Sequence, residues 1–169
     1  GLLFAKSNIQ LTSLIRGGGQ ERGKRAGTEN LPSIIGLATA LKDAQEHMQQ
    51  NTAYITGLRD ALRNGLDKID GAGFNGSREH CLPGTVNYSF QGVNGETLLS
   101  LLSNEGICCS SGSACSAGSL EPSHVLLALG LSHETAKSAL RFSLCEYNTM
   151  DEVQTIITKV TEAVNRLRR

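Results

Sequence analysis

The sequence has no excess of charge of either sign and no long hydrophobic run. Its 16 basic and 16 acidic side chains cancel, so no basic stripe predicts binding to nucleic acid or to an anionic membrane. No apolar run approaches the roughly 20 residues that cross a bilayer. Residues 1–5 form an apolar run too short for a signal peptide, and no basic residue precedes it. We therefore expect neither nucleic acid nor a membrane among the partners.

The sequence also lacks the cysteine patterns of disulfide scaffolds and zinc sites. An odd number of cysteines at irregular spacing argues against a disulfide framework. Zinc sites prefer paired Cys-x-x-Cys or His spacings, which are absent here. We expect no metal site, and we expect reduced thiols in a cytoplasmic protein. The five cysteines are Cys81, Cys108, Cys109, Cys115 and Cys145.

The chain has room for one domain, or for one domain and part of another. It has 169 residues, 39% of them hydrophobic, which suffices for one core. It opens with Gly-Leu-Leu-Phe and no initiator Met, a start typical of a strand entered midway. We therefore expect the C-terminal portion of a longer protein. A polar stretch at residues 47–52 separates two amphipathic helical patterns and predicts a domain boundary, although one helix could run through it.

Beyond residue 70 the pattern alternates between short strands and helices. Residues 85–90 alternate with period two and predict a half-buried strand. Residues 107–109 and 139–144 predict two more strands, and Thr149 with Glu152 forms a capping box before a strong helical stripe. This order predicts a small α+β unit with a mainly antiparallel sheet.

A run of small and hydroxylic residues surrounds one thiol, Cys115, within residues 108–124. Ser and Gly favour turns over regular structure, so we expect a loop that carries a thiol between two sites. Most free cysteines are instead small buried hydrophobes, but the neighbours of Cys115 are Ser and Ala rather than large apolar residues. For Cys108 and Cys109 the buried structural role is favoured.

Two further features could bind anions. Arg141 lies inside an apolar strand, where a charge is paired, exposed or aimed at an anionic ligand; the pattern leaves a structural salt bridge and a carboxylate clamp equally open. Residues 17–30 form a glycine-rich basic loop before a helix, which Asn30 can cap and in which Pro32 is tolerated in the first turn. Such a loop can hold phosphate, but alone it is a weak signal.

Three segments of the chain together resemble the pyridoxal-phosphate-dependent cysteine desulfurases of the class-V aminotransferase family. Their order and spacing agree along essentially all of the chain. The long thiol loop is similar to that of the NifS/IscS-like branch, which serves nitrogen fixation and general iron–sulfur cluster assembly. The segments are Gly-Gly-Gly-Gln-Glu-Arg-Gly at 17–23 with Gly-Thr-Glu-Asn at 27–30, Ser-Gly-Ser-Ala-Cys at 111–115 with Leu-Glu-Pro-Ser-His-Val-Leu at 120–126, and Leu-Arg-Phe-Ser-Leu at 140–144.

The resemblance implies an α/β protein, the C-terminal part of a fold-type I transferase. Residues 1–48 would be the tail of the large cofactor-binding domain. Residues 49–169 would be the small α+β domain, with its thiol loop at about 108–124. The family is a homodimer.

The resemblance also implies roles for three residues. Cys115 would take sulfur from L-cysteine as a persulfide and release alanine, and Arg141 would hold the substrate carboxylate. Thr28 would bond the phosphate of pyridoxal 5'-phosphate in the partner's site across the dimer. An iron–sulfur scaffold or another sulfur-acceptor protein would receive the sulfur.

One expected motif is absent. The family's Schiff-base lysine follows Ser-x-His, and no such setting occurs in this sequence, so that lysine would precede Gly1 and we expect the chain alone to be inactive. Two alternatives stay open, a selenocysteine lyase and a non-enzymatic sulfur carrier or docking module. A carrier would have no use for Arg141 or for the phosphate loop.

Overall fold

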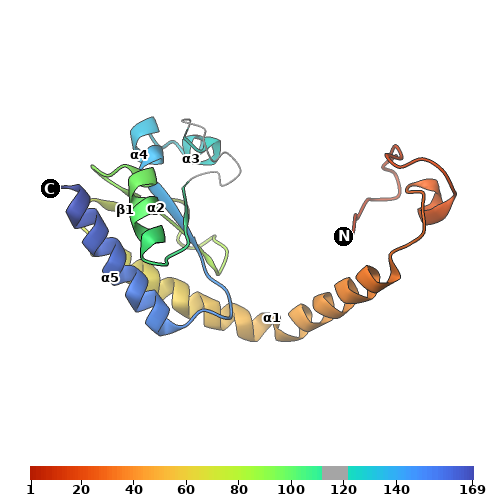
Figure 1. The fold of residues 1–169 in the computed structure, drawn as a ribbon, viewed down its shortest axis with the longest axis horizontal. Coiled ribbons are helices and arrows are strands. Elements are labelled where there is room, and N and C mark those ends of the chain that lie inside the picture. The colour runs from red at the N-terminus through yellow and green to blue at the C-terminus, as the bar shows by residue number, and fades with distance from the viewer. Residues whose placement is uncertain (112–121) are drawn as a thin grey trace. The chain divides into compact units, whose positions relative to one another are not determined.

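The computed structural model describes residues 1–111 and 122–169 (Figure 1). The chain divides into two compact units, Gly1–Met48 and Gln49–Arg169. Their identification with the end of a large domain and with a small domain stays a prediction. No helix within the described residues is long and apolar enough to cross a membrane.

The first unit holds a glycine-rich loop and the beginning of a long helix. The loop contains a short 3₁₀ helix, η1 (Gln20–Gly23). Asn30 caps α1 (Leu31–Leu66) by accepting a hydrogen bond from the backbone N–H of Ser33 at 3.1 Å, so the predicted cap is confirmed. The strand predicted at residues 1–4 is wrong. A strand needs a hydrogen-bonded neighbour, and none pairs with these residues in the described chain.

Helix α1 is continuous through the polar stretch that separates the two amphipathic patterns. Its second half belongs to the second unit, where Leu58, Leu62 and Leu66 are buried at a spacing of four residues. Side chains four apart share one helix face, so this half packs a continuous apolar stripe into the core.

The second unit contains a four-stranded sheet in the order β1-β2-β4-β3, with every neighbouring pair antiparallel. The predicted antiparallel α+β unit is therefore confirmed. Residues 107–109 are not a strand, because pairing with β4 begins only at Ser110; Ile107 is buried in the core instead. The strands are β1 (Ala72–Phe74), β2 (Thr85–Phe90), β3 (Ser110–Ser111) and β4 (Ala139–Ser143).

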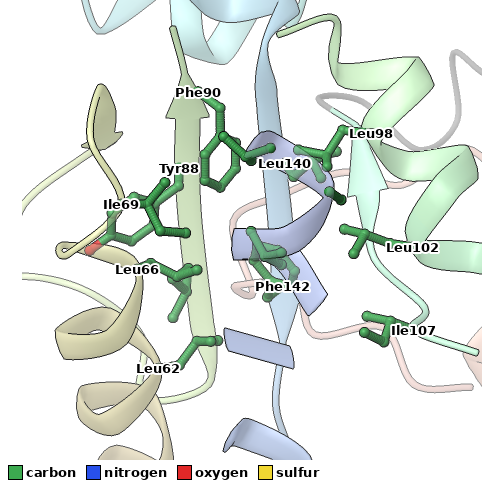
Figure 2. Packing of buried hydrophobic residues seen from close by; sticks show 14 of the residues in the cluster. Leu62, Leu66, Ile69, Tyr88, Phe90, Leu98, Leu102, Ile107, Leu140 and Phe142 are labelled. Carbon is green, nitrogen blue, oxygen red and sulfur yellow. The ribbon is translucent and has the colours of Figure 1, made fainter. Parts of the chain in front are cut away.

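One face of the sheet carries the hydrophobic core. Tyr88 and Phe90 of β2 and Leu140 and Phe142 of β4 lie among leucines of α1 and of α2 (Gly95–Asn104), as Figure 2 shows. Helix α5 (Met150–Leu167) adds Val153, Val160 and Val164. Its predicted capping box is confirmed, with both reciprocal hydrogen bonds of Thr149 and Glu152 present.

The opposite face of the sheet carries polar side chains, because successive residues of a strand point to opposite faces. At one end of this face two short helices, α3 (His124–Ala128) and α4 (His133–Lys137), pack against the sheet. Leu126, Ala136 and Ala139 form a separate buried cluster there. The rest of the polar face holds the candidate site.

Candidate functional site

Cys115, the predicted nucleophile, lies outside the described residues. Both neighbours of its segment contact the strand β4. On one side, Ser110 and Ser111 of β3 pair with Arg141 and Leu140. On the other side, Leu126 of α3 shares a buried cluster with Ala139. The sheet therefore anchors both flanks of the thiol-bearing segment to the strand that carries Arg141.

Arg141 lies at the centre of a polar row that crosses the sheet. Asn87 of β2 is its register partner on one side and Ser110 of β3 on the other. Paired residues of antiparallel strands present their side chains on the same face, with Cβ atoms about 5 Å apart. Asn75, just beyond β1, extends the row, since its backbone N–H donates to the carbonyl of Asn87 at 2.9 Å.

The side-chain amide of Asn75 bridges two residues of β2. Its Nδ2 donates to Oδ1 of Asn87 at 2.7 Å and to Oγ of Ser89 at 2.8 Å. Ser89 is only 4% exposed, so this bridge lies against the sheet rather than in solvent. The bridge fixes the amide orientation of Asn87 by occupying its oxygen.

The Arg141 guanidinium has no carboxylate partner in residues 1–111 or 122–169: every ion pair of those residues joins other groups. An arginine in a half-buried position retains its charge and favours an anionic partner. The described residues thus offer no partner for the structural salt bridge, and the carboxylate clamp stays a prediction. Arg141 can offer two parallel N–H donors to a carboxylate.

A second network fixes the edge of the sheet that leads to Asn75. Arg78 makes a bidentate pair with Asp67, at 2.7 and 2.9 Å, and the Tyr88 hydroxyl donates to the same carboxylate at 2.6 Å. The guanidinium groups of Arg63 and Arg78 also lie over the Phe74 ring, 4.8 and 5.2 Å from its centroid. These contacts join α1, β1, β2 and the segment after Asn75.

This network shifts two pKa values in opposite directions. The hydrogen bond from Arg78 lowers the pKa of Asp67 most, with a further contribution from Tyr88 that burial partly opposes. Burial raises the pKa of the Tyr88 phenol, and the Asp67 carboxylate raises it further. Tyr88 is therefore a neutral hydrogen-bond donor and Asp67 an anion at neutral pH.

The two cysteines that precede β3 differ in environment. Cys109 packs against the core, and this burial, together with the neighbouring Cys108, raises its pKa to about 11. Only the thiolate is nucleophilic, so Cys109 is a structural thiol at neutral pH, as its pattern predicts. Cys108 is exposed, so its predicted buried role is wrong.

Thr28 belongs to the first unit. It is exposed, and its hydroxyl makes no hydrogen bond with the described residues. The Arg25 guanidinium folds over the loop and donates to the carbonyls of Gly27 and Thr28 at 3.1 Å. Glu21 and Arg22 adopt φ values of 50° and 57°, in the left-handed region that side chains adopt at a cost. The role that the resemblance implies for Thr28 stays a prediction.

The polar partners of Arg141 are the residues that the sequence analysis missed. Asn75, Asn87 and Ser110 are ordinary residues for a turn, an exposed strand face and a loop. The one available signal is the alternation of Thr85, Asn87 and Ser89, which predicts that β2 has a polar face. The register that brings this face beside Arg141 comes only from the fold.

Comparison with known proteins gives a consistent result. The family model described as aminotransferase class-V matches residues 7–156. The chain is 43% identical over 169 residues to a cysteine desulfurase from Gluconacetobacter diazotrophicus, covering 99% of this chain and 42% of that protein. It is equally 43% identical to the cysteine desulfurase NifS of Azotobacter vinelandii, with the same coverage.

A solved structure of a NifS-like protein matches the fold with a TM-score of 0.83 and 37% identity, covering 96% of this chain and 41% of that one. The predicted likeness to NifS-like transferases is thereby confirmed. The chain spans 42% of the length of the two curated relatives.

Proposed function

Because this chain belongs to the class-V aminotransferase family, we propose that the complete protein is a pyridoxal-phosphate-dependent cysteine desulfurase. The observation that carries the proposal is the arrangement around β4. That strand holds an arginine without a carboxylate partner in the described chain, and both neighbours of the Cys115 segment contact it. A substrate carboxylate held by Arg141 would then lie at the strand that both flanks of the thiol-bearing segment contact.

In the proposed reaction the Cys115 thiolate attacks the sulfur of L-cysteine. A new S–S bond forms as the Cβ–S bond of the substrate breaks, and its electron pair stays with Cβ, which takes up a proton. L-cysteine and the Cys115 thiol thus give L-alanine and a Cys115 persulfide, with no external oxidant. Arg141 orients the substrate through its carboxylate, which brings reacting atoms together at reduced entropic cost.

Pyridoxal 5'-phosphate, when bound, supplies the electron sink that makes the Cβ–S bond cleavable. Within this chain Thr28 is the residue that would bond its phosphate, and Arg25 lies beside it. In the family this contact crosses a homodimer. The chain contains no lysine in a Ser-x-His-Lys setting, so the proposal assigns the desulfurase activity to the complete protein.

Three parts of the proposal rest on the resemblance alone. These are the homodimer, the transfer of the persulfide sulfur to an iron–sulfur scaffold or another acceptor protein, and a cytoplasmic location. A segment that carries Cys115 between two anchored flanks is suited to presenting a persulfide to such an acceptor.

The test is the intact mass of the complete protein after brief exposure to L-cysteine, measured with and without a thiol reductant. We expect the wild type to gain the mass of one sulfur atom reversibly, and Cys115→Ala to gain none. Cys108→Ala is the matched control, because Cys108 is the exposed thiol nearest in sequence, and it should gain sulfur like the wild type. An equal gain in the Cys115→Ala variant would refute the role of Cys115.

Activity assays on the complete protein distinguish the two alternative functions. Turnover of L-selenocysteine, with no turnover of L-cysteine, would indicate a selenocysteine lyase. Acceptance of sulfur only from another protein's persulfide, without alanine formation, would indicate a carrier.

A further inference from the structure

The polar row across the sheet contains hydrogen-bond donors in addition to those of Arg141. Asn75, Asn87, Arg141 and Ser110 are register neighbours across the whole sheet. The hydrophobic side chains of β2 and β4 occupy the opposite face, as Figure 2 shows for Tyr88 and Phe142. The row therefore lies on the face that is free of the main core.

The orientation of the Asn87 amide is set by its neighbour. Both side-chain N–H groups of Asn75 donate hydrogen bonds, one to Oδ1 of Asn87 and one to Oγ of Ser89. The oxygen of Asn87 is thereby occupied, and its Nδ2 is left with two N–H donors. Nδ2 of Asn87 donates no hydrogen bond to any group among residues 1–111 and 122–169.

We propose that Nδ2 of Asn87 donates to the same substrate carboxylate that Arg141 holds, and that Asn75 is a positioning residue that keeps this nitrogen turned toward it. The inference rests on the proposed desulfurase function and adds two residues to its substrate site. A carboxylate has about four lone-pair positions, so it can accept the arginine fork and one amide donor together.

The residue types fit this role. An aspartate at position 87 would itself pair with Arg141 and compete with the substrate. A lysine there would place a second cation beside Arg141, at a Coulombic cost. A neutral amide adds a donor without either effect, provided that its oxygen is held elsewhere. Asn75 holds the Asn87 oxygen through a hydrogen bond of 2.7 Å. A second hydrogen bond of 2.8 Å joins Asn75 to the buried Ser89.

The alternative is a purely structural amide network that stiffens the β1–β2 edge. A structural role makes no distinction between ligands. A role in carboxylate binding does, so the decisive quantity is the ratio of kcat/KM for L-cysteine to kcat/KM for L-cysteine methyl ester, measured on the complete protein with its cofactor. The ester lacks the anionic carboxylate but keeps the reacting sulfur.

Two variants address the two roles. Asn87→Ala removes the donor, and Asn75→Leu removes the donors that hold the Asn87 oxygen with little change of shape and without adding a charge. Thr85→Val is the matched control, because Thr85 lies on the same strand and face but pairs with Ser143 instead of Arg141.

We expect both variants to lower the ratio roughly ten- to hundredfold, the worth of one hydrogen bond to a charged group. The loss should fall on L-cysteine and leave the ester unchanged, and the control should keep the wild-type ratio. A parallel loss for both substrates, or an unchanged ratio, would overturn the inference in favour of the structural network.

If the proposed desulfurase function is wrong, the wild type will turn over neither substrate, and this result differs from every outcome above. Calorimetric binding of L-alanine and L-alaninamide then tests the row directly. A preference for the carboxylate that disappears in Asn87→Ala would support the site. Equal binding of both compounds, or binding of neither by the wild type, would overturn it.

Discussion

The carboxylate of Asp67 couples the stability of the sheet edge to pH. Its pKa is lowered in the folded state from 3.8, first by Arg78. A group with a depressed folded-state pKa stabilises the fold above its unfolded-state pKa. That contribution is lost as the pH falls through the folded-state value. Because the Asp67 side chain is 35% exposed, solvent screening reduces the effect well below that of a buried pair.

We predict that Asp67→Asn lowers the free energy of unfolding by about 1 kcal/mol at pH 7, the scale of a lost charged hydrogen bond after screening. The difference from the wild type should shrink as the pH falls below about 4, where the wild type protonates the same group. Urea unfolding at several pH values measures this. Asp70→Asn changes an exposed carboxylate of the same connection and should show no such profile; identical profiles for the two variants would contradict the argument.

Sequence reasoning at the residue scale finds residues whose type is unusual for their position. Arg141 is prominent because a charge interrupts an apolar strand, and Cys115 because a thiol lies among Ser and Ala. Asn87 is not prominent, since an amide on the exposed face of a strand is ordinary. Its importance comes from the register that pairs it with Arg141, and long-range register depends on the whole sheet rather than on local pattern.

At the element scale, helices α1 and α5 come together closely at Gly65. A Cβ at this position would collide with the side chain of Ile157, whereas a Cβ at Gly57 would meet nothing within 4 Å. Both glycines lie inside α1, where glycine costs roughly 1 kcal/mol relative to alanine. Gly65 therefore serves helix packing, and Gly57 has no such role within the described residues.

We predict opposite effects for the same substitution at the two positions. Gly57→Ala should raise the free energy of unfolding by roughly 0.5–1 kcal/mol through helix propensity. Gly65→Ala should lower it by about 1–2 kcal/mol, because overpacking outweighs the same gain. Adding Ile157→Ala to Gly65→Ala should cost less than Ile157→Ala does alone. Urea unfolding of the four variants measures this. Stabilisation by Gly65→Ala would contradict the prediction, because it would show that Ile157 moves aside at little cost.

Elements with strong local signals were predictable from the sequence. The predicted capping residues Asn30 and Thr149 are confirmed by their hydrogen bonds, because a cap is a local contact between residues three apart. Strand β1 (Ala72–Phe74) was missed and residues 107–109 were wrongly predicted as a strand. Short strands exist only through pairing with a neighbour, and no window of sequence contains that neighbour.

At the scale of the whole molecule, burial is distributed unequally between the two units. Every buried hydrophobic residue except Ala26 lies in Gln49–Arg169. The apolar residues on the first turns of α1 are exposed, among them Leu31 at 61% and Leu41 at 63%. Sequence periodicity predicts that this stripe is apolar but not what covers it.

This inequality predicts the hydrogen exchange of the backbone amides. In the chain of 169 residues, amides of β2 and β4 should exchange slowly and those of residues 1–48 quickly, because protection requires buried, cooperatively packed structure. The resemblance implies that residues 1–48 complete a larger domain. In the complete protein, residues 31–48 should then gain protection by orders of magnitude, while β2 and β4 change little. Mass spectrometry of both proteins measures this. Equal exchange of residues 31–48 in the two would contradict the domain assignment, since a helix face covered by the rest of a domain cannot exchange as it does uncovered.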